Sequence, residues 1–112
     1  MVVTVWEWVT VDFQTGHPGW RALCLGAGEV RIVVVAGWLM QEEMAYAEST
    51  GRRIADPDRL PYRRVVAAVT ADDAALVEAF TVEGFWRLLA PGEKVPGSAE
   101  VNAEVRRRAS MR

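Results

Sequence analysis

The sequence predicts an α+β fold in which a small, mainly antiparallel sheet of four or five strands packs against one helix. Three observations lead to this prediction. Residues 2–13 are mostly β-branched and aromatic, which favours a strand. Further apolar runs of strand length alternate with turns rich in Gly and Pro, and residues 70–73 carry a helix-capping pattern. The alternative is a partly open β-barrel with a helix, because a long first strand and glycine-rich turns permit strong coiling.

The length and composition predict one domain without covalent staples. A chain of 112 residues with 51% hydrophobic and 25% charged residues can bury an adequate core. We expect residues 1–92 to form the globular domain. Residues 93–112 contain Gly, Pro, Ser and charges with little bulk, which predicts a loosely ordered C-terminal tail.

Several classes of protein are disfavoured by composition. A single cysteine, Cys24, and a single histidine, His17, provide neither an internal disulfide nor a zinc site. No phosphate-binding glycine loop or other cofactor motif occurs, so no cofactor is expected. The N-terminal residues do not resemble a signal peptide, and no apolar run approaches the ~20 residues that span a bilayer. We therefore expect a soluble, cytoplasmic protein with no membrane partner.

The first strand carries the most distinctive pattern in the chain. Within residues 2–13, Trp6 and Trp8 share one face, while the odd positions form an apolar face. Glu7 interrupts that apolar face. Either a β-bulge between the two tryptophans turns Glu7 outward, or its carboxylate points toward the core and needs a partner.

The middle of the chain predicts further strands. Residues 20–25 and 29–38 form a hairpin around Gly26–Gly28, and the second of these is apolar on both faces, as expected for a central strand. Residues 39–50 fit either a strand or a helix, and the spacing of the apolar residues favours a helix. Residues 51–61 predict a long exposed loop, and residues 62–69 predict a strand buried on both faces.

The helix is predicted over residues 71–80. Thr70 can cap the first turn, and Asp72 and Asp73 would oppose the positive end of the helix dipole. After Gly84, residues 85–89 form a short apolar segment that fits a strand or a helical turn.

The best candidate for function is a binding surface. Large aromatic residues on one face of a strand must be covered by the helix, by a ligand or by another chain, and Trp and Arg often anchor protein interfaces. The sequence thus predicts a non-catalytic accessory or regulatory protein that binds another protein or itself. Homodimer formation is the simplest form. The candidate binding residues are Trp6, Trp8, Arg52, Arg53, Arg63 and Arg64.

Two alternatives remain. A nucleic-acid-binding protein would use the Arg-rich loop region and the basic C-terminus, although acidic residues are interleaved there and the net charge is −2. A small-ligand-binding protein or enzyme would have a pocket near Glu7, Asp12 and His17, with Cys24 as a possible nucleophile. Sequence spacing alone does not bring these side chains together.

Overall fold

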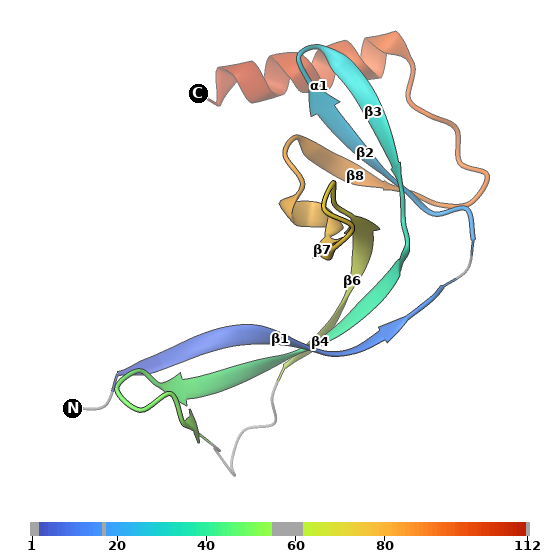
Figure 1. Ribbon diagram of the computed structural model, residues 1–112. Coiled ribbons are helices and arrows are strands. Elements are labelled where there is room, and N and C mark those ends of the chain that lie inside the picture. Colours follow the sequence, from blue (N-terminus) through green and yellow to red (C-terminus); the bar gives the residue numbers. More distant parts are fainter. Residues whose placement is uncertain (1–2, 17, 55–61, 112) are drawn as a thin grey trace.

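The chain forms two antiparallel sheets and one C-terminal helix (Figure 1). The computed structural model describes residues 3–16, 18–54 and 62–111. Within these residues the strands pair antiparallel and the sheet curls like half of a barrel, which confirms the predicted α+β class. In chain order the elements are β1 (Thr4–Gln14), β2 (Arg21–Gly26), β3 (Glu29–Val34), β4 (Gly37–Ala47), β5 (Arg53–Ile54), β6 (Arg63–Thr70), β7 (Leu76–Glu78), the 3₁₀ turn η1 (Ala79–Thr81), β8 (Phe85–Leu89) and α1 (Ser98–Ser110).

The strands are divided between two sheets. The larger has the order β1-β4-β6-β7, with β5 beside β4, and the smaller has the order β3-β2-β8. The prediction of one central strand over residues 29–38 is wrong. The chain leaves the smaller sheet after β3, where the Val35 amide still donates to the Trp20 carbonyl, and the Ala36 amide already donates to Ala68 of the larger sheet. β3 is therefore an edge strand, and its Val34 is 70% exposed.

Strand β4 replaces the helix that the spacing of residues 39–50 favours. β4 pairs with β1 on one side and with β6 on the other, so it lies inside the sheet. Its buried residues Leu39, Gln41 and Ala45 follow a period of two. Pairing on both sides outweighed the helical spacing of the methionines, because tertiary contacts override local preference.

The prediction of a helix over residues 71–80 is also wrong. The chain instead makes a tight reversal, in which the Ala71 amide donates to the Ala75 carbonyl and Asp73 Oδ1 accepts from the Ala75 amide. Ala74 takes a left-handed conformation there, with φ 67°. Aspartates that cap helices also favour turns. The reversal lets Val77 of β7 pair with Val69 of β6.

The helix of the fold lies where the sequence predicts a loosely ordered tail. Helix α1 covers most of residues 93–112, and the boundary at residue 92 stays a prediction. Glu104 accepts hydrogen bonds from Arg107 and Arg108 on the same helix. Arg108 also donates to the carbonyls of Gly84 and Phe85, at 2.9 Å each, and thereby anchors α1 to the start of β8. Helix α1 buries none of its residues. It therefore does not need an apolar face, and its apolar pattern is weak. Within the described ranges, no helix combines the length and apolar character needed to cross a bilayer.

The core lies between the two sheets, where small side chains allow close approach. Ala22 of β2 packs with Ala67 and Val69 of β6 and with Ala79 of η1. Larger residues surround this centre, among them Trp38, Phe85 and Leu88.

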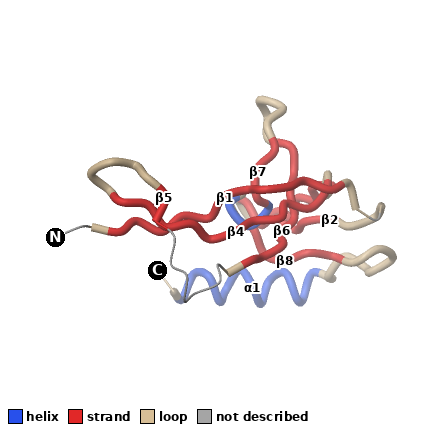
Figure 2. The backbone as a smooth tube through the Cα atoms, turned by 90° about the horizontal axis from the view of Figure 1, so that it is seen from below, coloured by secondary structure: helices blue, strands red, loops and turns tan. Residues whose placement is uncertain are grey.

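One end of the larger sheet extends beyond this core as a narrow arm. Residues 4–8 of β1 pair with residues 43–47 of β4 past the last pair between β4 and β6. We call this segment the arm; both views show it pointing away from the body that contains β2, β8 and α1 (Figures 1 and 2). The Cα radius of gyration is 17.8 Å, whereas a compact domain of this length has about 13 Å.

Candidate functional site

The arm and the adjoining part of β4 carry the two tryptophans on one face. Trp6, Trp8 and Thr10 of β1 lie opposite Ala45, Glu43 and Gln41 of β4, and paired residues share a face. We call this surface the tryptophan face. Trp6 is 47% exposed and Trp8 is 37% exposed. The sequence therefore placed both side chains correctly on a common face.

Trp8 belongs to a cation–π stack with Arg64 and Phe80. The guanidinium carbon of Arg64 lies 4.2 Å from the centre of the Trp8 ring and 5.3 Å from the centre of the Phe80 ring. A cation that contacts two aromatic rings is attracted by both, and the contacts hold the long arginine side chain in one place. β1, β6 and η1 thus meet at this stack, and Phe80 is a member that the sequence did not single out.

Gln41 lies beneath the stack and connects four strands. Its side chain is 2% exposed, and its amide nitrogen donates to Thr10 Oγ1 at 3.3 Å and to Glu78 Oε1 at 3.0 Å. Its amide oxygen accepts from Arg64 Nε at 2.7 Å. A buried amide with its hydrogen bonds made specifies one arrangement of its neighbours. Gln41 therefore fixes the position of Arg64 and, through it, that of Trp8.

Glu78 supplies the negative charge of this network. The hydrogen bond from Gln41, followed by a backbone hydrogen bond and the charge of Arg64, lowers the pKa of the Glu78 carboxyl below its ordinary value, although burial opposes the change. The carboxylate form is favoured, so the charge of Arg64 has a nearby counterion. The sequence did not predict a role for Gln41 or Glu78, because only the strand register brings the two side chains together.

Three of the four predicted arginines lie on the two faces of the sheet, and Arg52 lies in a turn. Arg53 and Arg63 both approach Glu42, at 3.7 and 3.5 Å, on the face opposite the tryptophans. Their side chains are 59% and 79% exposed. The backbone amide of Arg52 donates to Thr50 Oγ1 in the turn after β4. Arg64 alone among the four joins the tryptophan face, and most of the predicted loop, residues 55–61, lies outside the described residues.

The catalytic alternative does not gain a cluster from the fold. Glu7 lies exposed opposite Met44, and the bulge of β1 falls between Thr10 and Asp12, not at Glu7. The Asp12 carboxylate accepts a hydrogen bond of 2.9 Å from the backbone amide of the next residue, Phe13. His17 lies outside the described residues. Cys24 is buried in the smaller sheet, so Asp12 and Cys24 belong to different sheets.

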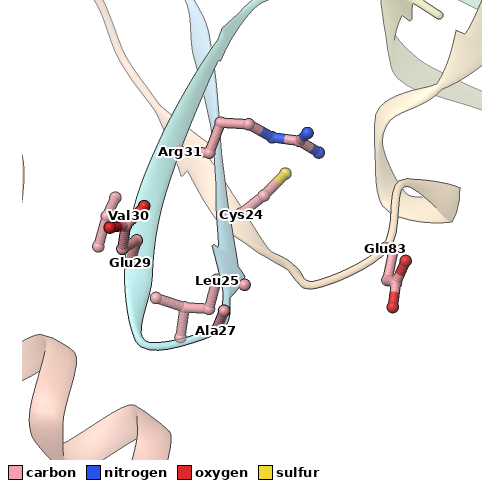
Figure 3. Close-up of a pocket in the computed structure, with 8 residues that line it drawn as sticks. Cys24, Leu25, Ala27, Glu29, Val30, Arg31 and Glu83 are labelled. Carbon is pink, nitrogen blue, oxygen red and sulfur yellow. The ribbon is translucent and has the colours of Figure 1, made fainter.

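A pocket of about 420 Å³ opens beside Cys24 at the β2–β3 hairpin. Figure 3 shows Arg31 reaching over the Cys24 thiol, with Glu83 across the opening. The thiol itself is buried and free. A nucleophilic thiol needs an adjacent base or a similar activating group. Among residues 3–16, 18–54 and 62–111, no three or more His, Cys, Asp or Glu side chains gather as metal ligands.

The outer edge of β1 is the edge that faces away from β4. The Glu48 amide donates to the Val3 carbonyl, and hydrogen-bonded pairs alternate along an antiparallel ribbon. The backbone groups of Val5, Glu7 and Val9 therefore face β4, whereas those of Thr4, Trp8 and Thr10 face away from it. In the described part of the chain, β1 pairs with no strand other than β4.

Comparison with known proteins leaves the interpretation to the geometry of this chain. No protein-family model, curated protein or solved structure matches it.

Proposed function

We propose that this chain is a non-catalytic accessory or regulatory protein that acts in the cytoplasm by binding a protein through the tryptophan face. The observation that carries the proposal is the position of two partly exposed tryptophans on an arm outside the core. Trp and Arg dominate the energetics of protein interfaces, and Trp8 is already stacked with Arg64. The cytoplasmic location follows the expectation from the sequence, which contains a single cysteine and no pair for an internal disulfide.

Preorganisation supports the same function. Binding loses affinity whenever flexible side chains must be ordered at the interface. Arg64 is held by Gln41 and by two aromatic rings before any partner arrives. A partner that packs against Trp8 therefore meets a surface whose shape is fixed by the buried network below it.

Nucleic-acid binding is the second candidate, and the exposed arginines favour it. Arg53 and Arg63 could contact phosphates, but both already approach Glu42, and Arg107 and Arg108 of α1 are paired with Glu104. Internal carboxylates compete with phosphates for the same cations. The protein-binding function is preferred for that reason. A mobility shift with nucleic acid that weakens with salt and with Arg63→Ala would reverse the preference.

Site-specific photo-crosslinking in the cells that express the chain tests the proposal. A photoreactive amino acid at Thr4, an exposed residue of the arm on the same face as Trp6 and Trp8, is expected to give one discrete protein adduct. The matched control places it at Asn102, an exposed position on α1, where no comparable adduct is expected. If neither position gives a discrete adduct, or if Asn102 gives the same adduct as Thr4, the assignment to the tryptophan face fails.

A further inference from the structure

We infer that the protein bound at the arm is a second copy of the chain, whose β1 pairs antiparallel with the outer edge of the first β1 and continues the tryptophan face. The inference rests on the proposed protein-binding function and names its partner. Two such edges would join the larger sheets of both copies into one continuous sheet with β1 strands at its centre.

The outer edge of β1 has the properties of a strand that pairs. It spans 11 residues, contains neither Pro nor Lys, and is rich in Val and Trp. Proteins protect exposed edges with Pro, Lys, bulges or very short strands, because unpaired backbone groups otherwise bind another strand. The only irregularity of β1 lies between Thr10 and Asp12, which leaves residues 4–10 regular.

The backbone groups of this edge are arranged for a partner strand. Every second residue of β1, including Thr4, Trp8 and Thr10, directs its amide and carbonyl groups away from β4, as in an antiparallel ladder. A second β1 related by a two-fold axis presents the same spacing, so the edge is complementary to itself.

The chain exposes more surface than a dimer interface of standard size requires. The chain exposes 8045 Å², whereas a compact monomer of 12.4 kDa exposes about 6,100 Å². The excess is on the order of 1,900 Å², and a standard interface buries about 800 Å² per partner. The arm accounts for much of the elongated shape that produces this excess.

Charge along β1 selects among the possible registers. Glu7 is the only charged residue in the regular part of β1, residues 4–10. A two-fold axis at Glu7 would oppose two carboxylates directly, which destabilises a sheet. A shift of two residues places Glu7 opposite Val5 or Val9 of the second copy. The inference takes the register with Val9, because it overlaps residues 4–12 of the two β1 strands and sets Thr10 opposite Trp6, whereas the register with Val5 overlaps only residues 4–8. Both registers bring the Trp8 side chains of the two copies to the same face, where they extend the tryptophan face across the junction.

Proline substitution at an outward-facing amide separates edge pairing from the fold itself. Thr10→Pro removes an amide that faces away from β4, and edge strands tolerate proline at such positions. Thr10→Val is the matched control, because it loses the same hydroxyl acceptor for Gln41 and keeps the amide. By size-exclusion chromatography with light scattering, the wild type and Thr10→Val are expected at twice the chain mass of 12.4 kDa. Thr10→Pro is expected at the single chain mass.

Residue-resolved amide exchange on the wild-type protein tests the same pairing without any variant. In the dimer, the outward amides of Trp8 and Thr10 are expected to exchange as slowly as the inward amide of Glu7, and their protection should rise with protein concentration. A wild type that is monomeric, or outward amides that exchange rapidly at every concentration, would overturn the inference. So would a folded Thr10→Pro variant that dimerises as well as Thr10→Val.

The crosslinked adduct at Thr4 distinguishes this failure from a failure of the proposed function. An adduct of two identical chains supports the dimer. An adduct with a different protein leaves the binding function standing and removes the second copy as the occupant. The absence of any adduct counts against both.

Discussion

Arg64 lies with its guanidinium carbon 4.2 Å from the centre of the Trp8 ring while its Nε donates to the buried side chain of Gln41 at 2.7 Å. One side chain thus joins the surface that we propose for binding to the hydrogen-bond network below it. The consequence is that stability and binding share a residue, and several measurements follow from that arrangement.

Arg64→Ala should lower the free energy of unfolding. The substitution removes a cation–π contact and leaves the amide oxygen of buried Gln41 without its donor, and an unsatisfied buried acceptor alone costs about 1–3 kcal/mol. We expect a loss of about 2–3 kcal/mol by urea unfolding. The neighbouring Arg63→Ala is the control, because its side chain is 79% exposed and pairs only at the surface. It should change stability by less than about 0.5 kcal/mol. Equal losses in both variants would contradict the role assigned to Arg64.

Glu78 should make the free energy of unfolding depend on pH in the acidic range. Its folded-state pKa is lowered, first by the Gln41 hydrogen bond and then by a backbone hydrogen bond and Arg64. The unfolded chain therefore binds the proton more readily, so the contribution of Glu78 is complete above its ordinary pKa of 4.5. It is lost as the pH falls through the lower, folded value. In Glu78→Gln, the loss of stability between neutral pH and pH ~3 should be smaller than in the wild type. Identical acid profiles for the two proteins would remove Glu78 from the network.

Arg108→Ala should release α1 from the body. Arg108 donates to the Gly84 and Phe85 carbonyls, and a hydrogen bond from a charged group contributes about 1.5–3 kcal/mol. Because 1.4 kcal/mol corresponds to a factor of ten, amide exchange or proteolysis within α1 should accelerate at least about tenfold. Arg106→Ala is the matched control, since among the described residues its side chain donates only to the Asn102 carbonyl of the same helix. Comparable acceleration in both variants would show that Arg108 is not the anchor.

Gly84→Ala should destabilise the protein more than Gly28→Ala. Both glycines have φ +80°, so both substitutions carry the strain of a left-handed conformation. At Gly28 a Cβ would meet nothing within 4 Å, whereas at Gly84 it would lie 2.0 Å from the Leu25 carbonyl oxygen. Relieving that overlap requires β8 to move away from β2, and overpacking costs typically 1–3 kcal/mol. Thermal unfolding of the two variants isolates the steric part, and similar midpoints would argue against the close approach.

The sequence predicted the elements whose signals are local. The strand over the β-branched residues of β1 and the Gly-rich hairpin before β3 appear as expected. Burial of β6 on both faces is confirmed for Ala67, Ala68 and Val69, whereas Val65 is 54% exposed. The common face of Trp6 and Trp8 follows from the period of two in any strand. These features need no knowledge of distant segments.

The elements that failed depend on contacts that spacing does not reveal. β4 is a strand because β1 and β6 pair with both of its edges. Residues 71–75 form a turn because β7 pairs with β6, although the same aspartates fit a helix cap. Helix α1 lacks a buried face, and its Glu104 and Arg108 contacts stabilise it instead.

The candidate site was predicted only in part, because some of its contacts depend on strand register. Trp6, Trp8 and Arg64 carry recognisable chemistry, whereas Gln41, Glu78 and Phe80 become partners only through strand register. Arg53 and Arg63 lie on the opposite face because neighbouring residues of a strand alternate between faces. A count of arginines near one loop could not separate them.

Strand β4 runs without interruption from the body of the protein into the arm, with Leu39 buried at one end and Ala45 at the other. A structural change at the tip of the arm is therefore transmitted to the core through the backbone of β4. A partner that binds the tip of the arm therefore also stabilises the core, and a substitution that destabilises the core weakens the binding of that partner.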